Sequence, residues 1–240
     1  MDEKTKKIKD FWDERADKWG AVWQATLAER WLRMTEIKTI MKYIQRRKPK
    51  SVLDIGCGNG FSTKEYARKF PMIKFFGLDY SEKMIEHAKK EPVDNCHFVV
   101  GDVLDPDSFP AGKFDIVTTQ RCIQNLPDYE SQAMAINNLR AKKSPDGVLL
   151  LMECSRDGVA QLNTLRMKLR MKPIENIMPW HNNFLTDQKV IDDFGAKIEY
   201  FSSTYMFLAK VLPLHPRLWV IGYLLPPIGK FGYDRLYIIK

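Results

Sequence analysis

The chain has 240 residues, a length that suits one α/β domain with a sizeable core. Hydrophobic residues make up 45% of the sequence and aromatic residues 12%, which excludes general disorder. The formal net charge is +8, but the basic residues are scattered. A solvated surface, an anionic substrate, a nucleic acid and a membrane surface therefore all stay open as explanations of the charge.

The cysteines and histidines form no metal-binding or disulfide pattern in the sequence. The four cysteines contain no CxxC pair, and the four histidines do not cluster with them. We expect free thiols, a reducing compartment and no bound metal.

The N-terminus is charged where a signal peptide would be apolar, and prolines and charged residues interrupt the most apolar stretch, residues 211–229. The sequence predicts a cytoplasmic protein without a membrane span and leaves peripheral membrane contact open.

Hydrophobic periodicity predicts an alternation of helices and strands. Two helices are expected first, at 5–19 and 25–45, because apolar residues recur there at helical spacing. Five near-continuous apolar strands follow, at 51–55, 74–80, 96–102, 114–120 and 148–154. Helices are expected between them, from the glycine turn to about 69, from Ser81, and from Tyr129 to Lys143, followed by a turn at SPDG. Strands of this kind form a parallel sheet covered on both faces.

The last third of the chain is less regular. Residues 156–183 show no clear pattern, whereas TDQKVIDDFG is predicted to be a helix with Thr186 as its N-cap and Gly195 as its stop. The stretches KIEYFSSTYMF and YDRLYIIK are predicted to be two late strands flanking the proline-rich apolar segment. Within one domain we expect helical lid residues 1–48, a core of residues 49–155, and a substrate side of residues 156–240.

Polar residues follow the ends of several predicted strands. Asp54 precedes three glycines in GCGNG, Asp79 ends the second strand, Asp102 follows the third, and residues 120–125 follow the fourth. Ligands of open parallel sheets bind at this edge. A pyrophosphate cofactor suits the amides of such a loop but not the preceding acid, so a cationic ligand such as S-adenosylmethionine fits better.

The motif VLDIGCGNG resembles the first motif of the class I S-adenosylmethionine-dependent methyltransferases. GLDYSEKMIEHAKK, VVGDVLD and FDIVTTQRCIQNLPD extend the resemblance over residues 50–154. It implies a three-layer α/β/α sandwich with a seven-stranded, mostly parallel sheet, an antiparallel last strand, N-terminal lid helices and an insertion between the last strands. The resemblance implies these cofactor-binding residues: Asp54, Gly56, Cys57, Gly58, Asp79, Tyr80, Met84, Gly101, Asp102, Val103, Gln120 and Trp19.

By this resemblance Asp79 accepts from both ribose hydroxyls, and Asp54 orients the amino group of the methionine part. FWDERADKWG resembles the lid helix of small-molecule methyltransferases, in which Trp19 and Trp23 would shield the sulfonium. Simpler roles stay open: Asp54 and Asp102 as turn or cap residues, Met84 as core, and the tryptophans as packing residues.

The candidate catalytic and acceptor-binding residues come from the later loops. His181, in PWHNN, is the candidate general base, with Glu153 and Asp157 as second choices. A structural histidine is the alternative. Candidates for the acceptor site are Arg121, Gln124, Asn125, Trp180, Asn182 and Tyr205. The alternative roles are membership of an ion pair for Arg121 and capping of the following helix for Gln124 and Asn125.

The sequence thus predicts a metal-independent enzyme that transfers a methyl group in line from S-adenosylmethionine, leaving S-adenosylhomocysteine, to the oxygen or nitrogen of a small molecule. The acceptor classes considered are a sugar, a lipid-linked molecule and an aromatic metabolite. The alternatives are an RNA or protein methyltransferase, a non-catalytic S-adenosylmethionine-binding protein and a nicotinamide-dependent oxidoreductase. We expect no nucleic acid partner, and a monomer or a homodimer.

Overall fold

A computed structural model describes residues 3–175, 180–212 and 214–240. One seven-stranded sheet forms the centre, in the order β3-β2-β1-β4-β5-β7-β6. The strands are β1 (Ser51–Ile55), β2 (Lys74–Asp79), β3 (Cys96–Val100), β4 (Phe114–Gln120), β5 (Lys143–Cys154), β6 (Lys197–Glu199) and β7 (Asp234–Ile239). β1 to β5 run parallel, while β7 is antiparallel to both β5 and β6. The predicted fold class is confirmed.

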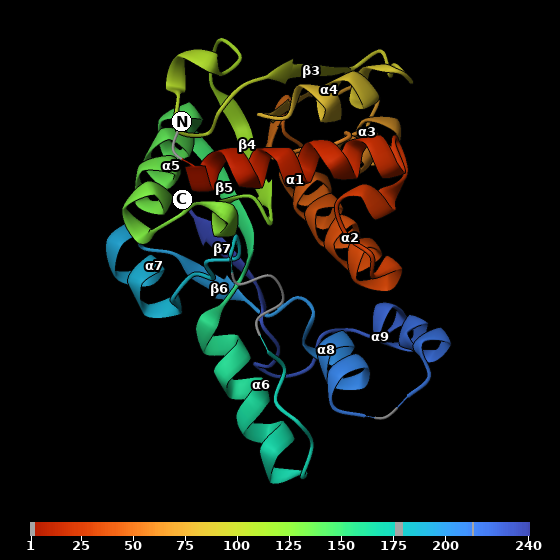
Figure 1. Cartoon of the computed structure of the whole chain (residues 1–240). Coiled ribbons are helices and arrows are strands. Elements are labelled where there is room, and N and C mark those ends of the chain that lie inside the picture. The colour runs from red at the N-terminus through yellow and green to blue at the C-terminus, as the bar shows by residue number, and fades with distance from the viewer. Residues whose placement is uncertain (1–2, 176–179, 213) are drawn as a thin grey trace.

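Helices cover both faces of the sheet, as Figure 1 shows. α2 (Arg30–Arg47), α3 (Phe61–Lys69) and α4 (Glu82–Lys89) pack on one face, and α5 (Tyr129–Lys142) and α7 (Asp187–Phe194) on the other. Alternate strand residues serve the two cores: Val148 and Leu150 of β5 join the α2–α4 side, and Leu149 joins the α5 side. This alternation explains why the central strands are apolar almost throughout.

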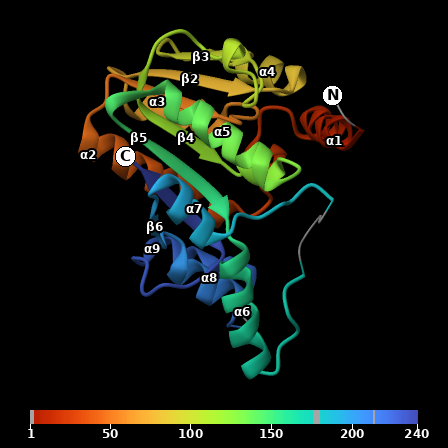
Figure 2. The same ribbon diagram turned by 90° about the vertical axis from the view of Figure 1, so that its left-hand side faces the viewer.

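The remaining elements lie outside the two cores. α1 (Glu3–Trp19) crosses the front of the molecule in Figure 1. α6 (Arg156–Lys168), α8 (Ser203–Lys210) and α9 (Val220–Leu224) gather at the end of the molecule away from β3 and α4 (Figures 1 and 2). Short 3-10 turns complete the chain: η1 (Trp23–Ala25), η2 (Pro106–Ser108), η3 (Ile123–Asn125) and η4 (Pro216–Trp219).

Three local predictions are wrong. Residues 156–168 form α6, which begins where Ser155 accepts from the Gly158 amide; this helix buries little, so its apolar periodicity is weak. KIEYFSSTYMF contains only the short strand β6, and α8 follows, because Tyr205 and Met206 pack in a core with Leu32. SPDG lies within the irregular start of β5.

Candidate active site

The site begins at the glycine turn between β1 and α3. Gly58 has a φ of +56°, and a Cβ at this position would lie 2.6 Å from Thr26 Cγ2. Gly56 has a φ of +68°, and its Cβ would lie 2.6 Å from Cys122 Cβ. Side chains are therefore excluded at both positions by conformation and by space. The turn places bare backbone at the carboxyl edge of the sheet.

A pocket opens at this edge, with a volume of about 1090 Å³ including the space at its mouth. The ends of β1, β2 and β4, the loop after β3, and α1 form its walls. A smaller adjoining pocket of about 280 Å³ shares Thr26, Arg33, Gly56 and Gln120 with it. Asp54 and Cys57 line the smaller pocket, and Gly58, Asp79 and Met84 line the larger one. The structure thus brings most of the predicted cofactor residues together.

The smaller pocket carries opposite charges with unused polar atoms. Asp54 is buried, and its Oδ2 accepts from Thr63 Oγ1 at 2.5 Å, while its Oδ1 has no hydrogen-bond partner. The Arg33 guanidinium is also buried, and its Nε has no partner. Burial raises the pKa of Asp54 to about 7, partly offset by the Thr63 hydrogen bond and by Arg33. A carboxylate and a guanidinium facing one small pocket suit an ammonium and a carboxylate of the same ligand.

Asp79 ends β2 beside the glycine turn. Its Oδ2 accepts from the Gly58 amide at 2.8 Å, and its Oδ1 accepts from the Ser81 amide at 3.0 Å. Burial raises the pKa of Asp79 to about 6, and the backbone hydrogen bonds oppose the rise. The acid therefore braces the glycine turn and also faces the large pocket. A carboxylate oxygen has two acceptor sites, so further donors from a ligand can bind here.

The loop after β3 forms the next wall of the pocket. Gly101, Asp102, Val103 and Leu104 line it, and Asp102 Oδ1 accepts from the Leu104 amide at 2.9 Å. Tyr80 and Met84 also line the pocket. The Tyr80 hydroxyl is buried without a partner. This part of the pocket combines apolar side chains with the carboxyl of Asp102.

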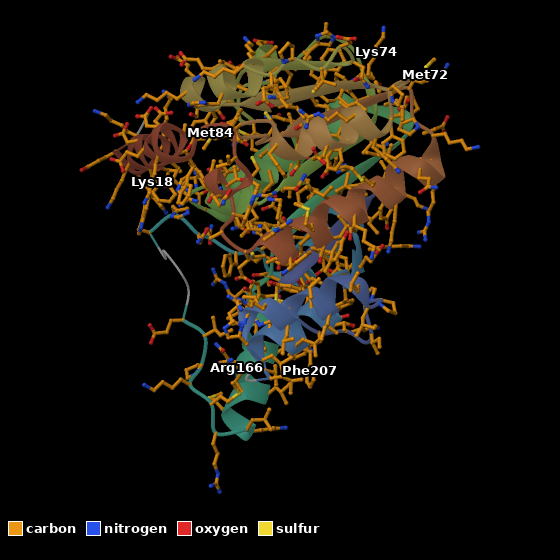
Figure 3. All side chains as sticks on the ribbon, turned by 90° about the vertical axis from the view of Figure 1, so that its right-hand side faces the viewer. Lys18, Met72, Lys74, Met84, Arg166 and Phe207 are labelled. Carbon is orange, nitrogen blue, oxygen red and sulfur yellow. The ribbon has the colours of Figure 1, made fainter. Side chains whose placement is uncertain are left out.

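Helix α1 covers the pocket. Thr5, Ile8 and Trp12 line it from this helix. α1 is tied to α4, since Ser81 Oγ donates to Asp13 Oδ1 and Lys83 pairs with Asp17 at 2.6 Å. Figure 3 shows Met84 of α4 beside α1, and Met84 packs with Trp12 and Trp19. Trp19 does not line either pocket; its ring packs under Lys18 instead.

Gln120 and Arg121 connect the pocket to a buried ionic network. Gln120 Oε1 accepts from Arg33 Nη1 at 3.1 Å. Arg121 Nη2 contacts Glu36 Oε1 and lies 3.5 Å from Asp234 Oδ1. Buried Glu36 also lies 3.4 Å from Arg33, so it joins the two arginines. Arg121 is thus both a member of an ion-pair network and a lining residue of the large pocket.

Asn125 is the second predicted acceptor residue in the large pocket. Its Nδ2 donates to the Arg121 carbonyl at 2.7 Å, and its Oδ1 is buried without a partner. Gln124 is turned away, because its Oε1 accepts from the Cys154 amide at 2.9 Å and its Nε2 donates to Asn182 Oδ1 at 3.2 Å. Gln124 and Asn182 line neither pocket.

The two second-choice bases, Glu153 and Asp157, do not line the pocket. Glu153 is buried and accepts from Thr119 Oγ1 at 2.6 Å and from the amides of Cys122, Ile123 and Gln124. Burial raises the pKa of Glu153 to about 7. The exposed Asp157 accepts from the Asp187 amide at 2.6 Å, at the start of α7. Both acids therefore stabilise the fold by accepting these hydrogen bonds, and neither lines a pocket.

His181 is buried against α1. Its ring lies 5.1 Å from the Phe11 ring, 6.1 Å from Trp12 and 4.4 Å from Trp180, measured between centroids. Burial lowers the pKa of His181 to about 4, and its Nδ1 has no partner. The imidazole is one ring removed from the pocket, since Trp12 lines the pocket and His181 does not.

The two remaining acceptor candidates also lie outside the pocket. Trp180 stacks near His181 and lies under Lys7, with 5.0 Å from Nζ to the ring centroid. The Tyr205 hydroxyl donates to Glu29 Oε2 at 3.0 Å within the core below α2. No group of three or more His, Cys, Asp or Glu side chains that could hold a metal occurs among the residues the structure describes.

Sequence reasoning missed Arg33 and the α1 residues that line the pocket. Arg33 lies in the middle of α2, where one arginine among several basic residues carries no signal. Trp12 belongs to the expected lid helix, but the resemblance singled out Trp19 and Trp23 instead. Only the folded chain shows which residues of α1 and α2 reach the pocket.

Known proteins match this arrangement. A family model described as a methyltransferase domain matches residues 46–193. Trans-aconitate 2-methyltransferase of Deinococcus radiodurans is 31% identical over 97 residues, which cover 40% of this chain and 36% of that protein. A tRNA N(3)-methylcytidine methyltransferase of Schizosaccharomyces pombe is 30% identical over 163 residues, covering 62% and 52%. The chain spans about a third to a half of the length of these curated relatives.

Among solved structures, the plantazolicin methyltransferase BpumL in complex with SAH superposes with a TM-score of 0.60. The match covers 99% of this chain and 98% of that chain at 19% identity, so it shows a shared fold over the whole length.

Proposed function

Because this chain belongs to the methyltransferase-domain family, we propose that it transfers a methyl group from S-adenosylmethionine to a small-molecule acceptor. Beyond the family membership, one structural observation is the main support for this proposal. Asp54 Oδ1 and Arg33 Nε are buried, unpartnered and opposite in charge, and both residues line the pocket beside the glycine turn. Buried polar atoms without partners are costly unless a ligand satisfies them. An α-amino acid end of a ligand satisfies both at once.

The other lining residues fit the rest of this cofactor. Gly56 and Gly58 leave room for its approach, and Asp79 accepts from the ribose hydroxyls. Tyr80 and Met84 pack on the adenine on one side, and Asp102 accepts from its amino group on the other. The pocket walls therefore offer the carboxyls of Asp79 and Asp102 and apolar surface, while Arg33 and Arg121 are paired with buried Glu36; this suits a sulfonium nucleoside better than a pyrophosphate.

The bound cofactor supplies an electrophilic methyl group on a positively charged sulfur. The protein contributes alignment of the acceptor and exclusion of water. Ile8 and Trp12 of α1 close the pocket above, and Leu126 and Pro127 close it from the loop after η3. These residues hold an acceptor in an apolar environment, where the charge of the sulfonium is least screened.

The lining also limits the kind of nucleophile. The acids lining the larger pocket are Asp79 and Asp102, which are assigned to the cofactor. His181 stays the proposed base, but a pKa of about 4 makes its imidazole a weak one. An acceptor that is already nucleophilic, such as an amine, a carboxylate or an acidic hydroxyl, needs no strong base. We therefore place such acceptors ahead of ordinary alcohols, with Asn125 and Arg121 as the polar contacts.

A nucleic acid acceptor is the second candidate, since one relative is a tRNA methyltransferase. The pocket argues for the small molecule: α1 covers it, no lysine of the described residues lines it, and its two arginines, Arg33 and Arg121, are paired with buried Glu36. Recognition of RNA requires a basic surface with aromatic stacking at the mouth of the site.

We also propose residues 1–48 as the lid, 49–155 as the core and 156–240 as the substrate side, in a cytoplasmic monomer or homodimer.

Calorimetric titration with S-adenosylhomocysteine and with NAD tests the proposal. We expect binding of the first and none of the second, and loss of binding in Asp79→Ala. Glu65→Gln is the matched control, because Glu65 pairs with Arg68 on the exposed side of α3. Binding of NAD alone would refute the assignment. Methyl transfer to pooled metabolites but not to total RNA then separates the two acceptor classes.

A further inference from the structure

The chain carries an exposed apolar surface far from the pocket. Leu218, Ile221, Leu224 and Ile228 are exposed along η4, α9 and the following loop, with Leu224 at 66% and Ile228 at 71%. Residues three apart on a helix lie on one side of it, as Leu218, Ile221 and Leu224 do. We call these four residues, with Arg217 and Lys230, the α9 face. Surfaces of this kind mark interaction sites.

The α9 face points away from the body of the protein. A Cβ at Gly222 would lie 2.7 Å from Tyr205 Cα, so this side of α9 packs tightly on α8. Tyr223 stacks on Trp31 and lies under Lys38, which fixes α9 against α2. α9 is therefore held in place by α8 and α2, while its exposed leucine and isoleucine side chains face away from them.

The charged residues of the segment that carries the α9 face are all basic. Residues 200–233 contain no Asp or Glu but include Lys210, Arg217 and Lys230. Lys210 pairs with Glu29, whereas Arg217 and Lys230 are exposed. From α2, Arg30 and Lys38 add further positive charge beside Trp31 and Tyr223.

The neighbouring helix α6 and the residues after it also combine basic side chains with exposed apolar ones. Arg166 Nη1 donates to the Lys210 carbonyl, and Gln161 Nε2 donates to the Lys230 carbonyl at 2.9 Å, so α6 lies beside this part of the chain. Figure 3 shows Arg166 and Phe207 together at this end of the molecule. Residues 158–174 also lack acids and carry exposed Met167 and Leu169 among four basic residues.

We propose that the α9 face binds the surface of an anionic lipid bilayer, with the aliphatic side chains entering the headgroup boundary and the basic side chains contacting lipid phosphates. None of the helices in the described parts of the chain is long and apolar enough to cross a membrane, so the contact is peripheral. A second copy of the chain would bring like charges together. Nucleic acid would be stacked by aromatic side chains, whereas this face is aliphatic. The proposal does not depend on methyl transfer.

Flotation of the whole chain with vesicles tests this. We expect binding to an equal mixture of phosphatidylcholine and phosphatidylglycerol, at least about tenfold tighter than to phosphatidylcholine alone. Leu224→Ser with Ile228→Ser should weaken binding at least about tenfold. Arg217→Glu with Lys230→Glu should weaken it at least about twenty-five-fold, at about fivefold for each basic residue lost.

Met72→Ser with Lys74→Glu is the control, because both residues are exposed and lie at the opposite end of the molecule from Phe207 in Figure 3, with Met72 at 93%. Circular dichroism checks that every variant is folded. The proposal is overturned if the chain ignores both vesicles, if the control weakens binding as much as the α9 variants, or if the serine variant only abolishes self-association. Unchanged S-adenosylhomocysteine affinity in the α9 variants keeps this test separate from that of the proposed function.

Discussion

Asp54→Asn tests the electrostatic match between the small pocket and its ligand. Burial raises the pKa of Asp54 to about 7, so its carboxyl is about 10% ionised at pH 6 and about 50% at pH 7. The ammonium of the ligand binds the ionised form and stays protonated over this range. Asp54 therefore contributes about a fivefold rise in affinity between pH 6 and 7. Asp79, with a pKa of about 6, contributes about twofold more.

Calorimetric titration with S-adenosylhomocysteine at the two pH values measures this. Wild-type affinity should rise about tenfold, and Asp54→Asn should bind more weakly and keep only the twofold rise. Thr63→Val is the matched control, because it removes the hydrogen bond to Asp54 Oδ2 but leaves the carboxyl; loss of this bond raises the pKa of Asp54 further, so the rise in affinity with pH should persist and be at least as large as in wild type. An equal pH dependence in wild type and Asp54→Asn would show that Asp54 does not face the ammonium.

The stability of the ligand-free protein should fall as pH rises, whereas the affinity for the ligand increases. A carboxyl whose pKa is raised by folding binds more protons in the folded state, so the free energy of unfolding falls as pH rises from about 4 to about 7. Asp54→Asn should therefore stabilise the free protein above neutral pH. The upper limit is about 4 kcal/mol, because the pKa moves from 3.8 to about 7 at 1.36 kcal/mol for each unit of pKa. Urea unfolding at pH 5 and pH 8 checks the sign.

The other predictions concern the turn, the ribose site and the candidate bases. Gly58→Ala should cost roughly 1–3 kcal/mol and weaken cofactor binding, because its Cβ would meet Thr26 Cγ2; unchanged melting and affinity would contradict the geometry. Asp79→Ala should abolish cofactor binding, and near-normal affinity would place the ribose elsewhere. Glu153→Ala should lower the free energy of unfolding by roughly 3 kcal/mol, since it leaves several buried donors without an acceptor. Lost turnover at unchanged stability would instead identify Glu153 as a base. His181→Phe should keep turnover if packing is the role of this ring, whereas lost turnover would support His181 as the base.

The first two thirds of the fold could be predicted from the sequence because each element there carries its own local signal. The strands of the core are continuous apolar runs, and Ser81 caps α4 by accepting from the Met84 amide, as its position predicts. The acids at the strand ends could be predicted to meet, because parallel strands finish at one edge. Asp54, Asp79 and Asp102 do lie at this edge.

The substrate side could not be predicted in the same way. α6 and α8 have weak periodicity of their own, and α8 is helical because Tyr205 and Met206 find partners on α2. His181 and Glu153 had the right chemistry for a base, but neither lines the pocket, since His181 packs against α1 and Glu153 accepts from the loop after β4. Their surroundings come from distant segments, which no local pattern encodes.

The sequence by itself determined the layered α/β core, the bare turn at Gly56 and Gly58, and the line of acids along one edge, because these follow from local propensity and from the direction of parallel strands. Tertiary structure alone decided that Arg33 shares the small pocket with Asp54, which residues of α1 line the large pocket, and that the α9 face stays exposed. Burial and the pairing of charges depend on which segments meet in space, and that is fixed only when the helices pack on the sheet.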